Sequence, residues 1–239
     1  MTLPVFIVKN EPRESAGLIE TVLKNHAVPH RVVELKEGHD FPDPSKCSAL
    51  VVMGGPDSAN DKTPRMKAEL AGVKRALELE TPYLGICLGM QVLVKAAGGQ
   101  VVKSPVKEVG FRMPDGRPYE IQLNFDGAKD PLFHSFRQRV FRVFQLHGET
   151  VELPPGVIAL GTGDPVPVQI VRAGRRAYGI QCHFELTPKL FETWLREDDD
   201  LQKMNAADLR SDFKAIEKDY EETGGLLIEN FFTLAGVFK

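Results

Sequence analysis

The 239-residue sequence predicts an α/β fold: a mostly parallel open sheet of the flavodoxin-like kind, covered by helices on both faces, with added antiparallel strands. Up to residue 97, short apolar runs alternate with segments in which apolar residues recur at helical spacing. Between residues 101 and 181, apolar runs follow one another closely, separated by Asp-Gly, Pro-Pro-Gly and Ala-Gly turns. The first pattern is typical of parallel strands joined by helices, and the second of antiparallel strands.

The alternating part can be divided into elements from its apolar runs and its helix signals. Strands are expected at 3–8, 31–35, 49–53 and 83–86, and helices at 14–26, 64–79 and 88–97. Pro29 ends the first helix, while Thr63 and Pro64 provide a cap and a first position for the second. The third helix is almost wholly apolar, so we expect it to be buried.

The remaining part is first rich in strands and then helical. Strands are expected at 119–123, 140–145, 157–162, 166–172 and 176–181. A helix after Thr187 buries one apolar face, and 226–234 forms a last apolar helix. The acidic segment 196–222 has few apolar residues and is expected to be a solvated helical face or an irregular excursion. Since no linker or repeat interrupts the chain, one domain over 1–239 is expected.

Composition excludes several classes of function. Lys and Arg number 30 against 33 Asp and Glu, a net charge of −3, which argues against non-specific binding to nucleic acid or to an anionic membrane. The three cysteines are too few for a disulfide framework and indicate a reducing compartment. The beginning of the chain does not resemble a signal peptide, and no run of about 18 apolar residues could span a membrane. We therefore expect a cytoplasmic protein.

One cysteine lies between an expected buried strand and an expected buried helix, in Gly85-Ile86-Cys87-Leu88-Gly89-Met90-Gln91. Glycines stand two residues on either side of Cys87, the spacing of a nucleophile on a sharp strand-to-helix turn. The helix that begins at Leu88 directs its N-terminal dipole at the sulfur and favours the thiolate. The alternative is a buried structural cysteine at a tight turn, and the paired glycines favour the nucleophile.

A thiolate nucleophile requires a base, and His183 is the best candidate among the six histidines. It follows an apolar strand, at the edge where open α/β sheets place their sites. Because side chains alternate along an extended chain, Glu185 is expected on the same side, where its carboxylate can orient the imidazole. Alternation turns Cys182 toward the packed face. Without Cys87, a strand-end histidine beside a surface glutamate would be the preferred interpretation.

A glycine turn, Gly54-Gly55-Pro56, ends another expected strand. Glycines at such a position let bare backbone N–H groups approach a ligand, and such groups can stabilise the oxyanion of acyl transfer. By itself the turn is weak evidence. Its spacing matches neither a Walker loop nor a dinucleotide-binding motif.

Together, the motifs resemble the class I glutamine amidotransferases, the family with a Cys-His-Glu triad. The family's hallmarks are a Gly-Gly-Pro turn, a Gly-x-Cys-x-Gly-x-Gln elbow and a His-x-Glu, and this chain has all three in that order, so the resemblance covers at least 49–188. The segment Leu146-His147-Gly148-Glu149, followed by a Leu-Pro turn, is similar to the GMP-synthetase-like branch. Phe184 stands where proline is commonest, and Glu149 where aspartate is usual.

The resemblance implies a role for each matching residue. Cys87 would attack the side-chain amide of glutamine, His183 would move the proton and Glu185 would orient the imidazole. The backbone N–H groups of Gly55 and Leu88 would form the oxyanion hole.

For the substrate, the resemblance implies that Gln91 and the backbone at Gly148 and Glu149 help to hold glutamine. It implies no metal and no redox cofactor. The sequence carries neither a P-loop nor a Ser-Gly-Gly-x-Asp-Ser stretch, so the acceptor of ammonia is expected either to be an ATP-dependent synthetase on another chain or to be absent.

Two other functions compete with ammonia delivery. A stand-alone γ-glutamyl hydrolase or peptidase, which releases an amine other than ammonia, would have the same elbow and triad. A catalytically silent binding or regulatory module would keep the fold but would not need an intact set of Cys87, His183 and Glu185.

Overall fold

The computed structural model describes residues 3–238, and one large mixed sheet organises them. The sheet has nine strands in the order β2-β1-β3-β4-β11-β10-β9-β6-β7. Its strands are β1 (Val5–Lys9), β2 (His30–Glu34), β3 (Ala49–Val52), β4 (Tyr83–Ile86), β6 (Glu120–Leu123), β7 (Val140–Arg142), β9 (Val157–Gly163), β10 (Ile170–Ala173) and β11 (Ala177–Ile180). Two further strands, β5 (Gln100–Gly110) and β8 (Gln145–Glu152), form a separate antiparallel ribbon.

Parallel and antiparallel pairing divide the sheet at β11. The pairs β2–β1, β1–β3, β3–β4 and β4–β11 are all parallel, so these strands end at the same edge of the sheet. The pairs β11–β10, β10–β9, β9–β6 and β6–β7 are antiparallel. This arrangement confirms the predicted mostly parallel sheet with added antiparallel strands.

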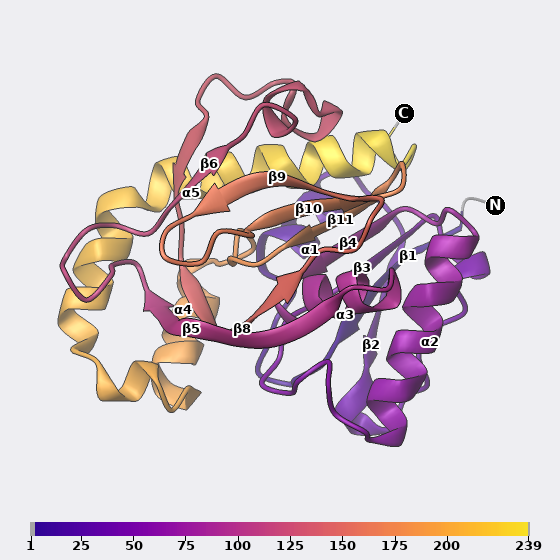
Figure 1. The fold of residues 1–239 in the computed structure, drawn as a ribbon, viewed down its shortest axis with the longest axis horizontal. Helices are drawn as coiled ribbons and strands as arrows, with labels where there is room; N and C mark the ends of the chain where they lie inside the picture. Colours follow the sequence, from indigo (N-terminus) through magenta and orange to yellow (C-terminus); the bar gives the residue numbers. More distant parts are fainter. Residues whose placement is uncertain (1–2, 239) are drawn as a thin grey trace.

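Helices cover both faces of the sheet (Figure 1). The helices are α1 (Gly17–Asn25), α2 (Pro64–Glu78), α3 (Leu88–Ala96), α4 (Pro188–Glu197) and α5 (Ala206–Leu234). Apolar residues of α1 and of the second half of α5 pack with the sheet in one buried cluster, whereas those of α2 and α3 pack with it in another. The Thr63 hydroxyl accepts a hydrogen bond from the N–H of Met66, which confirms the predicted cap of α2.

The β5–β8 ribbon departs from the expected elements. The strand expected over 140–145 is divided, because its first residues pair with β6 in the large sheet while Gln145 begins β8. β5 was not expected at all. Its exposure pattern is irregular and its register shifts between Lys103 and Glu108, so it lacks the regular alternation that identifies a strand in sequence. The strand expected over 166–172 begins only at Ile170, after Pro167.

The acidic segment 196–222 is neither irregular nor merely solvated. Most of it forms the first half of α5, a helix of 29 residues that runs behind β9 toward the C-terminus (Figure 1). Most of its helical residues are exposed, as expected for a solvated helical face, but Leu209, Phe213 and Tyr220 of α5 are buried with residues of α4 in a third apolar cluster. The helical alternative is thus confirmed, with the addition of one buried stripe that a few large apolar residues suffice to form.

None of the helices in residues 3–238 combines the length and the apolar character that a bilayer span requires.

Candidate active site

The predicted nucleophile lies on a tight turn between β4 and α3. Cys87 has φ 50° and ψ −106°, a backbone conformation that a non-glycine residue rarely adopts, and it immediately precedes the first residue of α3. The strained turn is held by a hydrogen bond of 2.7 Å from the N–H of Cys87 to the carbonyl oxygen of Ile180 in β11. Cys87 is 6% exposed. A strained strand-to-helix turn of this kind presents a side chain above the sheet.

The two glycines that flank Cys87 allow this turn to pack. A Cβ on Gly85 would lie 2.4 Å from the carbonyl group of Gly89, and a Cβ on Gly89 would lie 2.2 Å from the carbonyl oxygen of Val52 in β3. Neither neighbour is a flexible side chain that could move aside. The spacing of the elbow motif therefore reflects close contact between α3, β3 and β4.

The predicted base and its partner form a buried pair. Nδ1 of His183 lies 2.8 Å from Oε1 of Glu185, and both residues are almost fully buried. They are in a turn after β11 rather than in extended chain, so the contact comes from the turn and not from the strand alternation we expected. Burial lowers the pKa of His183, but the Glu185 carboxylate and the Cys87 thiol outweigh burial and hold that pKa well above its ordinary value. The imidazolium is thus stabilised by the Glu185 carboxylate and by the sulfur of Cys87.

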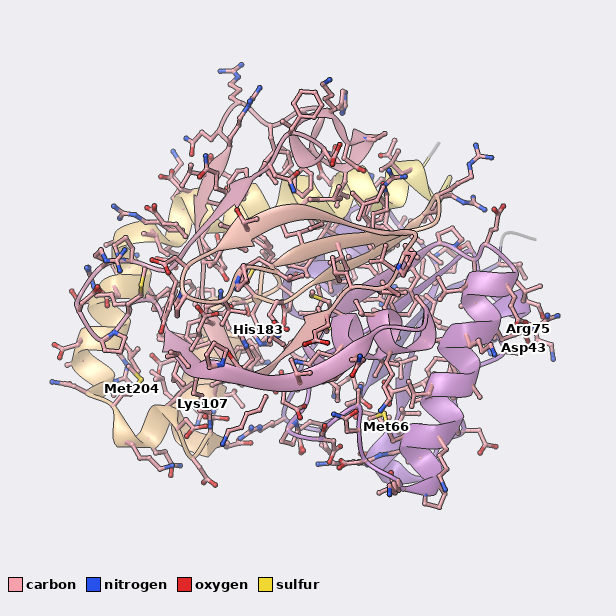
Figure 2. All side chains as sticks on the ribbon, viewed as in Figure 1. Asp43, Met66, Arg75, Lys107, His183 and Met204 are labelled. Carbon is pink, nitrogen blue, oxygen red and sulfur yellow. The ribbon has the colours of Figure 1, made fainter. Side chains whose placement is uncertain are left out.

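The third apolar cluster supports His183 from behind. The Trp194 ring packs edge-on against the imidazole, with ring centroids 4.8 Å apart. The Tyr220 hydroxyl donates to the backbone oxygen of His183, and the N–H of His183 donates to the carbonyl oxygen of Phe144. Figure 2 shows His183 near the middle of the molecule. The helices α4 and α5 thus hold the histidine in place, which the sequence did not indicate.

The glycine turn after β3 lies against both reactive side chains. A Cβ on Gly54 would lie 3.2 Å from Cε1 of His183 and 3.4 Å from Cβ of Cys87. A Cβ on Gly55 would lie 3.5 Å from a methyl carbon of Leu88, the first residue of α3. The first N–H groups of a helix have no partner within the helix. The structure thus brings together the two residues whose N–H groups were predicted to bind an oxyanion.

Amide side chains connect α3, β8 and the end of β11. Nε2 of Gln91 lies 3.3 Å from the carbonyl oxygen of Glu149 and 3.3 Å from Oε1 of Gln181, and Nε2 of Gln181 lies 3.5 Å from Sγ of Cys87. The sequence analysis did not select Gln181, although it directly precedes Cys182-His183. The Glu149 carboxylate accepts from the Ser58 hydroxyl at 2.9 Å, so it is tied to the loop after β3.

His147 lines the same region, and both of its ring nitrogens lie close to oxygen atoms of other residues. Nε2 lies 2.7 Å from Oε2 of the fully buried Glu108, and Nδ1 lies 3.0 Å from the carbonyl oxygen of Glu149. Glu108 also accepts from Gln169 at 3.2 Å, and Gln169 accepts from Gln145 at 2.9 Å. This chain of polar groups joins β5, β8 and the segment before β10. It holds His147 in a structural position.

A cavity of about 470 Å³ opens at these residues. Its lining includes Cys87, His183 and the predicted substrate residues Gln91, Gly148 and Glu149. A charged part of the wall comes from the β1–α1 loop, from β5 and from the α4–α5 connection: Arg13, Glu14, Lys103, Lys107, Asp198 and Asp200. Figure 2 shows Lys107 in the lower part of the view, toward α4.

Glu14 is a site residue that the sequence analysis missed. It is 4% exposed, and its nearest ionic partner, Arg13, lies 3.9 Å away and is itself bound to Asp198 at 2.8 Å. Burial raises the pKa of Glu14 from 4.5 to about 7. His183 lowers this pKa and Glu185 raises it, and both effects are smaller than that of burial. Its signal in the sequence was weak, because an acidic residue just before a helix is ordinarily solvated.

The other two cysteines are buried away from this chemistry. Burial raises the pKa of Cys47 to about 11 and that of Cys182 well above its ordinary value, so both thiols stay neutral. All three cysteines are free thiols. Within residues 3–238, no group of three or more His, Cys, Asp or Glu side chains is arranged to hold a metal ion.

Comparison with known families assigns the chain to a class. Residues 16–199 match the family described as Glutamine amidotransferase class-I. The chain belongs to this family, as the order of its three motifs indicated.

Individual relatives share part of the sequence or the whole fold. The chain is 32% identical over 156 residues to the glutamine amidotransferase-like protein YfeJ of Salmonella typhimurium, covering 63% of this chain and 62% of that protein. It is 32% identical over 153 residues to a GMP synthase [glutamine-hydrolyzing] of Thermosipho melanesiensis, covering 63% of this chain and only 26% of that protein. The crystal structure of a glutamine amidotransferase from Methylobacillus flagellatus has the same fold, with a TM-score of 0.84, 24% identity, and coverage of 98% of this chain and 96% of that one.

Proposed function

We propose that this protein hydrolyses the side-chain amide of glutamine through a thioester on Cys87 and delivers the ammonia to a synthetase on another chain. The observation that carries the proposal is the convergence of three elements on one cavity: Cys87 on its strained turn, the hydrogen-bonded pair of His183 and Glu185, and the glycine turn at Gly54 and Gly55. These elements supply a nucleophile, an oriented base and backbone donors.

The proposed reaction has two steps. In the first, the Cys87 thiolate attacks the amide carbon, and the N–H groups of Gly55 and Leu88 stabilise the oxyanion. The carbon–nitrogen bond then breaks as His183 gives its proton to the leaving nitrogen, which releases ammonia and leaves a thioester. In the second, His183 takes a proton from water, the resulting hydroxide equivalent opens the thioester, and glutamate leaves as the thiolate is restored.

Electrostatics of the pair fit this sequence of steps. The raised pKa of His183 keeps an imidazolium available to the leaving amine, and Glu185 stabilises that charge. Gln91 and the backbone at Gly148 and Glu149 line the same cavity and are proposed to hold the rest of the glutamine molecule.

The partner and the compartment are part of the same proposal. The relative from Thermosipho melanesiensis is named as a glutamine-hydrolyzing GMP synthase, and this chain matches 26% of its length. We propose that an ATP-dependent synthetase on another chain accepts the ammonia. Three free cysteines fit a reducing, cytoplasmic location.

Cavity size favours one second candidate, a γ-glutamyl hydrolase or peptidase. A cavity of about 470 Å³ lies within the range of pockets that hold a whole small molecule, so an amine larger than ammonia could be accommodated. The charged wall formed by β5 and the α4–α5 connection would then contact the amine.

Two measurements test the nucleophile and the base. A glutamine-like affinity label is expected to modify Cys87 before Cys47 or Cys182, and preferential labelling of Cys182 would refute the assignment. His183→Ala is expected to lower turnover by roughly 10²–10⁴-fold, and Glu185→Gln by less, because the second change removes orientation and charge but keeps the proton carrier. An unchanged rate in His183→Ala would refute His183 as the base.

Steady-state product release separates the two candidate reactions. Ammonia release from glutamine is expected to be slow for the isolated protein and to rise when the true synthetase and its substrates are added. High turnover of a γ-glutamyl amine without any partner, together with poor turnover of glutamine, would favour the hydrolase.

A further inference from the structure

A buried carboxylic acid lies beneath the glycine turn and does not line the active-site cavity. Glu69 of α2 and Asn10, the residue after β1, are both fully buried. Nδ2 of Asn10 donates to Oε1 of Glu69 at 3.0 Å and to the carbonyl oxygen of Met53 at 3.2 Å. Met53 directly precedes Gly54-Gly55. Asn10 therefore connects α2 to the turn that carries a proposed oxyanion donor.

The same two side chains leave two acceptor atoms without a partner. Oδ1 of Asn10 and Oε2 of Glu69 are buried, and neither has a hydrogen-bond partner. Leaving buried acceptors unpaired is costly. Because Nδ2 of Asn10 already binds Oε1 of Glu69, we infer that a proton on Oε2 of Glu69 would remove both deficits by donating to Oδ1 of Asn10. The two side chains then share two hydrogen bonds in a ring, as a carboxylic acid and an amide do.

We propose that Glu69 carries a proton at mildly acidic pH and, paired with Asn10 in this ring, is a positioning residue for the glycine turn of the active site. The part that concerns catalysis rests on the function proposed above. Gly55 packs closely against Asn10, since a Cβ on Gly55 would lie 2.8 Å from Cβ of Asn10 and 3.5 Å from Leu88. We expect loss of the ring to let Asn10 rotate and to displace the glycine turn.

Surrounding charges are compatible with a neutral Glu69. Arg65, one turn earlier in α2, is bound to Asp57 of the loop after β3 at 2.5 Å, so its charge is compensated. Tyr83 of β4 is fully buried, and its hydroxyl donates to the carbonyl oxygen of Gly89 at 2.8 Å, so it cannot donate to Glu69. Burial raises the pKa of Glu69 from 4.5 to about 7, although Asn10 and Arg65 act in the opposite direction and Asp57 in the same one. Ionisation of Glu69 is thus expected as the pH rises through about 7.

The first test reads the proton directly and does not depend on activity. Difference infrared spectra between the wild type and Glu69→Gln, recorded on the full-length protein from pH 5 to 9, are expected to contain a protonated-carboxyl band at pH 5–6 that fades above pH 7. A spectrum with only a carboxylate band at pH 5–6 would refute the proposal that Glu69 is protonated and paired with Asn10. This outcome is distinct from failure of the proposed function, which would appear as an absence of glutamine or γ-glutamyl turnover in the wild type.

The second test reads the effect on the active site. Glu69→Gln retains one donor and one acceptor, so kcat is expected to stay within about threefold of the wild type at pH 6, while the loss of activity caused by ionisation above pH 7 disappears. Glu69→Met has a similar length but cannot form the ring, and it is expected to lower kcat by roughly 10- to 100-fold with little change in KM, the effect of a small misplacement of a catalytic donor.

A matched control lies on the same helix. Glu78→Gln changes an exposed glutamate of α2 and is expected to leave the pH profile of the wild type unchanged. If Glu69→Gln follows the wild-type profile at every pH, as the control does, the positioning role is refuted. If Glu69→Met does not fold, the glutamine variant and the infrared spectra still decide the proposal.

Discussion

Gly89→Ala tests whether the elbow around Cys87 depends on close backbone packing. The new Cβ would lie 2.2 Å from the carbonyl oxygen of Val52, whereas ordinary contacts begin at 3.4 Å, so α3 and β3 must separate by about 1.2 Å. Overpacking of this kind costs about 1–3 kcal/mol of the free energy of unfolding. Because Cys87 and the first N–H of α3 move with the helix, a displacement near 1 Å is expected to lower reactivity by roughly 100-fold.

The assay combines urea unfolding with the rate at which a glutamine-like affinity label modifies Cys87. Labelling reports on the elbow even if turnover requires a partner. Gly225→Ala is the control, because its Cβ would meet no atom within 4 Å in the middle of α5, and it is expected to gain about 0.5–1 kcal/mol with an unchanged labelling rate. Wild-type stability and labelling in Gly89→Ala would show that the glycine is not required for packing, and the account of the elbow would fail.

Three further changes have directions that follow from the structure. Glu14→Gln should remove a pH dependence of the free energy of unfolding. Because the pKa of Glu14 is raised, its contribution to wild-type stability is complete below about pH 4.5 and is lost as the pH rises through about 7, by at most roughly 3 kcal/mol at about 1.4 kcal/mol per pH unit. Urea titrations at pH 5 and 8 measure the difference. His183→Gln should also remove a pH dependence of the free energy of unfolding. The stability that the charged histidine gains from Glu185 is present below about pH 6.5 and is lost as the pH rises through the raised pKa of His183. A wild type that gained stability over the variant above pH 7 would contradict this. Gly224→Ala should lower the free energy of unfolding by about 1–3 kcal/mol and slow the labelling of Cys87. Its Cβ would lie 2.3 Å from the carbonyl oxygen of Phe184 and would push α5 away from His183. The melting temperature and the labelling rate measure the two effects.

Local patterns in the sequence were sufficient for the parallel part of the fold. Strands β1 to β4 and helices α1 to α3 lie within a few residues of the ranges expected from apolar runs, Thr63 and the glycine pairs. These signals are short-range, since a cap, a turn or an apolar stripe depends on neighbours within about four residues. The positions of Cys87 and of the glycine turn followed from the same signals, because parallel strands end at one edge of the sheet.

Tertiary structure decided the parts of the site that depend on distant partners. The ribbon strand β5 was missed because its pairing with β8 defines it, and the buried stripe of the first half of α5 was missed because its few apolar residues find their contacts on α4. A buried polar side chain has no local signature, because its burial depends on partners far away in sequence. For that reason Gln181, Glu108 and Glu14 were recognised only in the structure.

The sequence by itself therefore determined the family, the order of strands and helices up to residue 97, and the residue types that could carry acyl-transfer chemistry. Only the tertiary structure decided that His183 and Glu185 meet in a turn, that α4 and α5 support the histidine, and that Asn10 and Glu69 lie beneath the glycine turn. The physical reason is that chemical identity and local geometry are properties of adjacent residues. Burial, pKa and the pairing of polar groups are properties of the whole packed molecule.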